Sequence, residues 1–290
     1  MATEEDLGCS VRGHAAELDE TVKSGCCLLR NWRNAAFARG QKHVKGNSRT
    51  EDPLLNWTRP SREECPICMI PLPLNGAETI FWICRGKIIC CGCIYDQFLV
   101  DRKDGHLTID ESSFRICPFC RNGSTTFDIL DREMKLAKVG HPTALFRIGI
   151  RHFDGELLQR DTQEGIKWFR RVAEAGEAEA AFNLGVCYSQ GDGVEQDTDR
   201  AMEYLQKAAE LGYAQGFAAI GNLLEQKGSI EEGFLNYRKA AICGYCDKEL
   251  FGVLRDGYKY GYITKEEYAF TLRENQRASN EMKSESREKY

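Results

Sequence analysis

The sequence predicts a mostly α-helical protein in which a small cysteine-rich zinc module precedes a solenoid of helix hairpins. Two observations support this fold class. Eight of the 14 cysteines fall within residues 65–120, and the second half of the chain repeats itself at an interval of 36 residues. Closely spaced cysteine pairs are typical of structural zinc sites. A repeat of this length is typical of stacked helix pairs, because one hairpin cannot bury its apolar face alone.

The repeats are marked by small residues at fixed positions. Two series recur 36 positions apart, Ala144, Ala180 and Gly216 in one and Gly149, Gly185 and Gly221 in the other. We expect these small side chains to let neighbouring helices approach closely. In the second unit the helices are predicted at about 178–189 and 199–211, with Asp197 or Thr198 as the N-cap of the second helix. A glycine follows each second helix, which suits a left-handed C-cap.

A specific sequence pattern identifies the class of repeat. The second unit carries A-x-F-x-L-G-x-x-Y-x-x-G-x-G-V at 180–194 and K-A-A-E-x-G at 207–212. These residues resemble the Sel1-like repeat, a relative of the tetratricopeptide fold, and the 36-residue interval favours the Sel1-like form. The resemblance covers roughly half of the chain. It implies a surface that binds peptides or partner proteins.

The cysteine-rich stretch offers zinc ligands in pairs. Within residues 65–120 the Cys-x2-Cys pairs are Cys65 and Cys68, Cys90 and Cys93, and Cys117 and Cys120, and Cys84 stands apart from them. Structural zinc takes four cysteine or histidine ligands in a tetrahedron. In a reducing compartment, clustered cysteines are metal ligands rather than disulfides. Buried cysteines without metal, and a different zinc fold built on the same pairs, are the alternatives.

The order and spacing of these cysteines resemble a RING finger. The resemblance implies a ββα module with interleaved ligand pairs that hold two Zn²⁺ ions. Carried over, the first site consists of Cys65, Cys68, Cys90 and Cys93. The sequence supplies all four ligands of this site.

The second site lacks one ligand of the RING pattern. The resemblance assigns Cys84, Cys117 and Cys120 to it, but Lys87 stands where the pattern has a histidine. A protonated lysine has no lone pair to offer to zinc. Cys91, His106 and a water molecule are the candidates for the eighth ligand, and the sequence leaves the choice open.

A RING has no catalytic nucleophile, and the resemblance implies a ubiquitin ligase that docks a charged E2 enzyme. Ile67 lies inside the first pair, and Pro118 and Arg121 lie in and just after the last pair, where RING domains place their E2 contacts. Arginine suits position 121 because its planar guanidinium can donate to two carbonyl groups at once. The alternative for Arg121 is an ordinary surface charge. The Sel1-like array would then bind a substrate or an adaptor protein.

The whole arrangement is similar to a RING–Sel1 family abundant in diatoms and related stramenopiles. The terminal motif T-K-E-E-Y-A-x-T-L-R supports this similarity. Members of that family often have two adjacent cysteines where this chain has Cys84 and Arg85, and if both bind metal in those relatives, the second zinc site is weakened here. A non-enzymatic, zinc-containing interaction scaffold with a degenerate RING is therefore the alternative function.

These features divide the chain into five segments. They are a flexible basic N-terminal region (1–60), the RING-like module (61–125), a linking helix or half-repeat (126–141), about three Sel1-like repeats and a partial one (142–262), and a terminal helix with a charged tail (263–290). We expect the terminal helix to open with a capping box from Thr264 to Glu267.

Charge and hydropathy limit the partners and the compartment. The net charge of −5 hides a basic stretch at residues 23–62, which contains nine lysines and arginines but only two acidic residues. A solvated tail explains this stretch more simply than nuclear import or nucleic-acid binding, so we expect no nucleic-acid partner. No apolar run approaches the ~18 residues of a membrane helix, and the N-terminus has no apolar signal segment. We therefore expect a cytoplasmic or nuclear protein with no membrane partner.

Overall fold

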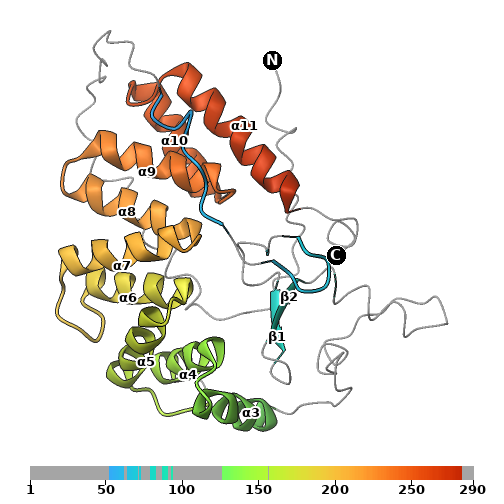
Figure 1. Ribbon diagram of the computed structural model, residues 1–290. Helices are drawn as coiled ribbons and strands as arrows, with labels where there is room; N and C mark the ends of the chain where they lie inside the picture. The colour runs from blue at the N-terminus through green and yellow to red at the C-terminus, as the bar shows by residue number, and fades with distance from the viewer. Residues whose placement is uncertain are drawn as a thin grey trace.

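The computed structural model shows a helical array beside a short β-hairpin (Figure 1). It describes residues 52–61, 64–70, 72, 79–82, 87–90, 93, 126–155 and 157–282. The elements are β1 (Thr79–Trp82), β2 (Lys87–Cys90), α3 (Thr126–Lys138), α4 (Pro142–Asp154), α5 (Thr162–Glu174), α6 (Ala178–Gln190), α7 (Thr198–Glu210), α8 (Ala214–Gln226), α9 (Ile230–Ile242), α10 (Lys248–Tyr260) and α11 (Lys265–Glu281). No helix among the described residues is long and apolar enough to cross a bilayer.

The helices form an α-solenoid, which confirms the mostly α-helical fold class. They stack in chain order from α3 to α11 (Figure 1), and α3 to α10 each have 13 residues. The pairs α4–α5, α6–α7 and α8–α9 are the three repeat units, and α3 packs on α4 as a half-unit. At the other end α11 packs against α9 as well as α10, so it covers the last complete unit.

Local sequence signals set the ends of these helices. The Asp197 carboxylate accepts a hydrogen bond from the backbone N–H of Arg200 (3.0 Å), which confirms Asp197 as the N-cap of α7. Thr264 and Glu267 form the expected capping box at the start of α11. Gly212, which follows α7, has a φ of +91° and ends the second unit in the left-handed conformation. The repeat boundaries are therefore coded locally.

The two series of small residues allow close contact between two different sets of helices. A Cβ added at Gly221 would lie 2.6 Å from the ring of Tyr237, and one at Gly185 would lie 2.7 Å from Leu205. Both neighbours belong to the second helix of the same unit. A Cβ at Gly216 would instead lie 2.9 Å from the carbonyl oxygen of Leu205, in the preceding unit. One series therefore allows close packing within a unit, and the other allows close packing between units.

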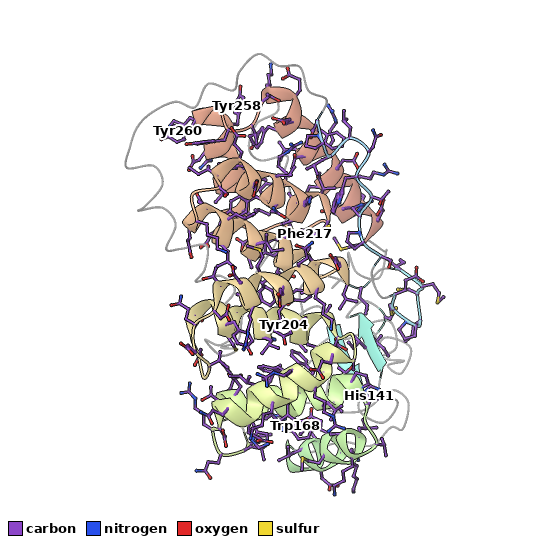
Figure 2. All side chains as sticks on the ribbon, turned by 60° about the vertical axis from the view of Figure 1, so that its left-hand side comes forward. His141, Trp168, Tyr204, Phe217, Tyr258 and Tyr260 are labelled. Carbon is purple, nitrogen blue, oxygen red and sulfur yellow. The ribbon has the colours of Figure 1, made fainter. Side chains whose placement is uncertain are left out.

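Aromatic residues fill the remaining space inside the units. Trp168 and Tyr204 occupy equivalent positions of α5 and α7, and both are half-buried against the core (Figure 2). The Tyr204 ring stacks on Tyr188 in the first helix of its own unit, with centroids 5.7 Å apart and planes at 1°. Such stacking adds to the apolar burial that holds the two helices of a unit together.

A buried ion cluster joins the half-unit to the first repeat. Glu133 of α3 is fully buried, and its carboxylate oxygens lie 2.6 Å from Arg147 and 2.6 Å from Arg151, both on α4. Burial by itself would raise the pKa of Glu133. Hydrogen bonds and charge from Arg151 and Arg147 outweigh the burial and hold the pKa below its usual value. The carboxylate therefore stays ionised and fixes the angle at which α3 meets the array.

Residues 52–61 differ from the sequence prediction. The interval 1–60 was expected to be flexible, but the described part of it lies beside α9 and α11 (Figure 1). Leu54 is only 3% exposed, and Asp52 pairs with the buried Arg238. The partners lie about 200 residues further along the chain, so local composition does not reveal them. Residues 1–51 lie outside the described part.

Candidate functional site

The first cysteine pair forms a tight turn ahead of the hairpin. The backbone N–H of Cys65 donates to the carbonyl of Ile70 (2.9 Å), and the N–H of Met69 donates back to the carbonyl of Cys65 (2.9 Å). Met69 has a φ of +57°, a conformation that residues other than glycine rarely adopt. These bonds close a small loop around Cys68.

The β-hairpin brings the second cysteine pair, Cys90 and Cys93, toward the first. β1 and β2 are antiparallel, with Thr79 opposite Cys90 and Trp82 opposite Lys87. Ile89 of β2 is fully buried, and Cys93 follows three residues after the end of the strand. The strand therefore carries the chain from Lys87, where the RING pattern has a histidine, directly into the pair formed by Cys90 and Cys93.

Three of the predicted ligands converge. The sulfur atoms of Cys65, Cys68 and Cys93 all lie within 4.8 Å of one another, and the Cys65 and Cys93 Sγ atoms are 3.8 Å apart. Two sulfurs bound at ~2.3 Å to one tetrahedral zinc would be ~3.8 Å apart. Cys65 and Cys93 are buried, while Cys68 is half-buried. The three thiols therefore fit three corners of a tetrahedral zinc site.

The fourth ligand of this site is expected to be Cys90. Cys90 is the last residue of β2, three positions before Cys93, and its side chain lies outside the described part of the structure. The geometry thus fits the ligand set of the first site at Cys65, Cys68 and Cys93, and the complete four-cysteine site stays a prediction.

The second zinc site stays a prediction throughout. Its proposed residues lie outside the described residues, and they are Cys84, Cys91, His106, Cys117 and Cys120 together with the E2-contact candidates Pro118 and Arg121. Ile67, the remaining E2-contact candidate, lies in the first turn with its side chain 43% exposed.

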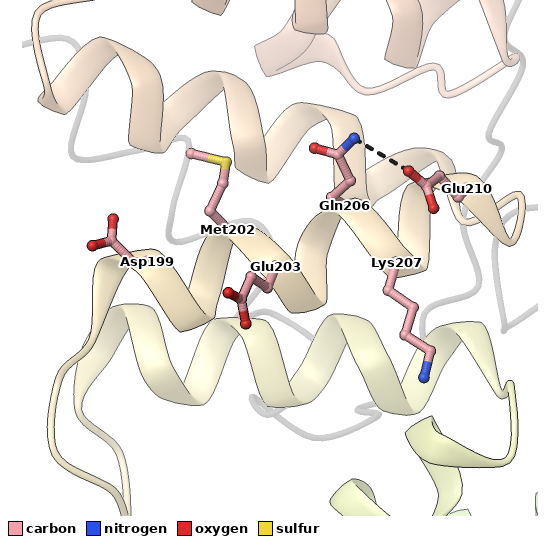
Figure 3. A pocket seen from close by; sticks show the side chains of 6 residues that line it. All are labelled: Asp199, Met202, Glu203, Gln206, Lys207 and Glu210. Atoms are coloured by element: carbon pink, nitrogen blue, oxygen red, sulfur yellow. Dashed lines mark hydrogen bonds between the residues drawn. The ribbon is translucent and has the colours of Figure 1, made fainter.

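A second surface feature is a shallow depression along α7 (Figure 3). Its volume is about 480 Å³, and it is lined by Asp199, Met202, Glu203, Gln206, Lys207 and Glu210. The Gln206 amide donates to Glu210 (3.2 Å), and Asp199 pairs with Lys227 (2.9 Å). These polar groups belong to one exposed helix face and pair with near neighbours. The depression is therefore part of the outer surface of the array rather than an enclosed ligand site.

Sequence reasoning missed the contact surface of residues 52–61. The available signal was an isolated set of apolar residues, Leu54, Leu55 and Trp57, between Pro53 and Pro60 in a polar region. That signal shows that the segment has something to bury. It does not show which helices cover it.

Comparison with known proteins identifies the repeats. Residues 142–177 and 178–213 match the family model described as "Sel1 repeat". This match confirms the Sel1-like interpretation of the first two units, α4–α5 and α6–α7. The third unit, α8–α9, repeats their packing, with Gly221 against Tyr237 as Gly185 is against Leu205. The family match does not reach the cysteine-rich segment.

Two solved structures are similar in part. A Sel1 repeat protein from Oxalobacter formigenes is 27% identical, with a TM-score of 0.45 over 51% of this chain and 62% of that one. A protective antigen of uropathogenic Escherichia coli that displays an SLR fold is 23% identical, with a TM-score of 0.47 over 57% of this chain and 36% of that one. The chain thus spans less than two thirds of either protein. No curated protein matches the sequence.

Proposed function

We propose that the protein is a RING-type E3 ubiquitin ligase. In this proposal the cysteine-rich module holds two zinc ions and docks an E2 enzyme charged with ubiquitin. The Sel1 repeats bind the substrate or an adaptor protein, in line with the general use of stacked helix pairs as protein-interaction scaffolds. The repeat array is the part that the family match supports, and the ligase activity is the part that experiment must decide.

The convergence of the thiols carries the proposal. Cys65 and Cys93 are 28 residues apart in sequence, yet their sulfurs approach to 3.8 Å. Cys84, a predicted ligand of the other site, lies between them in the chain. Pairing of the first and second cysteine pairs across the intervening Cys84 is the interleaved order that the RING pattern requires. A zinc fold with ligands taken in sequence order would pair Cys65 and Cys68 with Cys84 instead.

Exposed apolar side chains beside the thiols support a docking role. Ile67 is 43% exposed and Met69 is 67% exposed, and both lie on the turn that carries Cys65 and Cys68. Burial of such side chains against a partner would contribute ~1–2 kcal/mol each. Bound zinc would supply structure and no chemistry, since a site with four protein ligands has no open coordination position. The chain's own residues would hold the E2 and would not react.

A transfer assay tests the ligase. We expect autoubiquitination with at least one E2 of a broad panel, and we expect Ile67→Ala to reduce it by tenfold or more while zinc content stays the same. Leu211→Ala is the matched control, because Leu211 is 41% exposed but lies at the C-cap of α7, away from the thiols. A folded, zinc-loaded chain that is inactive with every E2 would refute the proposal.

A non-enzymatic scaffold is the second candidate, and Lys87 favours it. If no eighth ligand replaces the missing histidine, the chain would bind one zinc ion firmly and would not hold its last cysteine pair in place. Metal analysis separates the two cases. Two zinc ions per chain, with one lost on Cys91→Ser or on His106→Ala, would support a complete RING. One zinc ion in all three proteins, together with absent transfer, would support the scaffold.

A further inference from the structure

A buried arginine marks a contact surface on the distal half of the array. Arg238 of α9 is 2% exposed, and its guanidinium lies 3.0 Å from the Thr271 hydroxyl and 3.4 Å from the Glu267 carboxylate, both on α11. The Asp52 carboxylate also pairs with Arg238. A buried cation of this kind needs carboxylate partners, because desolvation of an unpaired charge is costly. Part of that requirement is met from outside the array, by Asp52.

Apolar and aromatic contacts extend this surface toward α8. Leu54 is 3% exposed, and Trp57 meets the ring of Phe217 edge to face, with centroids 5.5 Å apart at 82°. The Lys239 ammonium lies 5.8 Å from the centre of the Trp57 ring. An edge-to-face pair and a cation–π contact each contribute ~0.5–1.5 kcal/mol beyond burial. Trp57 is therefore the central anchor of the segment.

An ion pair of the opposite polarity lies at the C-terminal end of the segment. The Arg59 guanidinium donates twice to the Glu281 carboxylate, at 2.9 and 3.0 Å. At one end of the segment, Asp52 is the acidic partner of an arginine of the array. At the other end, Arg59 is the basic partner of a glutamate of the array, so the two ends of the surface differ in charge. This difference fixes the direction in which the segment lies.

We propose that the surface of α8, α9 and α11 is a peptide-binding site and that residues 52–61 are its built-in ligand. The site takes linear peptides with an acidic residue, an apolar residue two positions later, an aromatic residue three after that and a basic residue two further on. In this chain those positions are Asp52, Leu54, Trp57 and Arg59. The inference rests on the interaction role proposed for the array and names the chemistry of one partner.

The segment is built as a separate unit. It begins with its own turn, in which the N–H of Leu54 donates to the Asp52 carboxylate (3.0 Å) and the N–H of Leu55 donates to the Asp52 carbonyl (3.0 Å). The contacts to the array described above are made by side chains. A peptide that carries the same side chains at the same spacing can therefore replace the segment without any change in the array.

Replacement would also affect the cysteine-rich module. The segment ends at Ser61, four residues before Cys65, and on the other side the module leads into α3, which Glu133 ties to α4. The module is thus held to the array at both ends. A competing peptide would release the N-terminal attachment and leave the attachment through α3.

The tethered segment competes with any free peptide. The segment is tethered to the array through the module, residues 62–125, so its effective concentration is set by that tether and is on the order of 1 mM. The wild-type chain therefore binds an added peptide weakly. Trp57→Ala in the full chain loosens the tethered segment and leaves the surface intact. We expect a fluorescent peptide of residues 50–61 to bind this variant at least tenfold more tightly than it binds the wild type, by fluorescence anisotropy.

Matched variants of the peptide and of the chain distinguish sequence-specific recognition from nonspecific binding. The same peptide with Trp57→Ala should lose tenfold or more in affinity. In the Trp57→Ala chain, the additional change Glu281→Arg should weaken binding of the normal peptide. A peptide with Arg59→Glu should bind this double variant with restored affinity. Glu281 is 42% exposed, so this exchange leaves the core unchanged.

If the Trp57→Ala chain has the melting temperature of the wild type but does not bind the peptide, the proposal is overturned. Equal binding of the normal and Trp57→Ala peptides overturns it too. Should Trp57→Ala unfold the chain, the full-length Arg59→Ala variant serves as receptor, with the same expected order of affinities. The readout needs no E2, so an inactive ligase with a functional peptide site, or the reverse, is recognised at once.

Discussion

The repeat array and the described part of the cysteine-rich module bury different kinds of side chain. In the array, apolar side chains from every helix pair are fully buried, among them Val172, Leu184 and Leu254. Among the module residues whose burial the structure describes (64–70, 72, 88, 89 and 93), the buried apolar positions are Cys65, Ile89 and Cys93. Two of these three are predicted zinc ligands. The array therefore has a hydrophobic core of its own, whereas the buried positions described in the module are mainly predicted zinc ligands.

The difference follows from size and connectivity. Each repeat buries its apolar face against the next, so stability accumulates along the array. A segment of about 60 residues buries a smaller fraction of its surface than a long array, so its stability is marginal, and metal ligation is the usual remedy. The module should therefore depend on zinc for its stability, and the array should not.

The largest expected effect is loss of the first zinc site. Cys65→Ser should release zinc and unfold the module, because structural zinc binding is worth ~10 kcal/mol or more. The helical circular dichroism of the array should remain. Cys187→Ser is the control, since burial raises the pKa of the Cys187 thiol to about 12 and this residue lies in α6. Simultaneous unfolding of the array in Cys65→Ser would show that the two regions form one cooperative unit.

The next largest effect is expected at the junction of the two regions. Glu133→Ala leaves Arg147 and Arg151 without their buried carboxylate and should cost ~3 kcal/mol in chemical denaturation. Asp131→Ala is the control, because its pair with Lys135 is exposed and worth ~0.5 kcal/mol or less.

The effect of Glu133 should depend on pH in a defined direction. Its pKa in the fold lies below the ordinary value of 4.5, so its contribution is full above that pH and is lost as the pH falls through the folded-state pKa. The gap between Glu133→Ala and the wild type should therefore close in strong acid. A gap that widens as the pH falls below 4.5 would contradict the ion-pair interpretation.

Within the array, close helix packing is the feature to test. Gly221→Ala places a methyl group 2.6 Å from the buried Tyr237 ring and should cost ~2 kcal/mol, measured as a lower urea midpoint. Gly233→Ala makes the same change where the nearest atom is 3.1 Å away. There the ~1 kcal/mol gain in helix propensity should offset the crowding. Equal costs at the two positions would refute the packing argument.

The smallest effect concerns a polar exception in the array core. Burial raises the pKa of Glu225 to about 7, although the hydroxyl of Tyr237, 3.0 Å away, lowers it in part. Because the folded-state pKa is above the unfolded value of 4.5, the fold is destabilised as the pH rises from about 4.5 through 7. Glu225 is half-buried, so the cost at pH 8 is only ~1 kcal/mol.

Replacement of Glu225 should reveal this cost. Glu225→Gln should be more stable than the wild type by ~1 kcal/mol at pH 8 and no more stable at pH 5, in matched thermal melts. A gain of equal size at both pH values would mean that ionisation of Glu225 is not the cause.

Most of the array was predictable because its signals are local and repeated. The capping residues Asp197 and Thr264 and the glycine after each second helix lie within a few positions of the helix ends that they set. The second predicted pair of helices, 178–189 and 199–211, agrees with α6 and α7 to within one residue. The ligand pattern of the first zinc site was also local, since each cysteine pair is a four-residue motif.

The sequence by itself thus determined which segments become helices, where each repeat begins and ends, and which thiols are available for zinc. The RING resemblance implied that Cys65 and Cys93 share a site, and their sulfurs do approach each other. Only the tertiary structure decided that Asp52, Trp57 and Arg59 lie on α8, α9 and α11. The physical reason is range. Helix ends and repeats depend on neighbours within one or two turns of the chain. Contacts between groups 28 to 222 residues apart depend on how completed elements pack together.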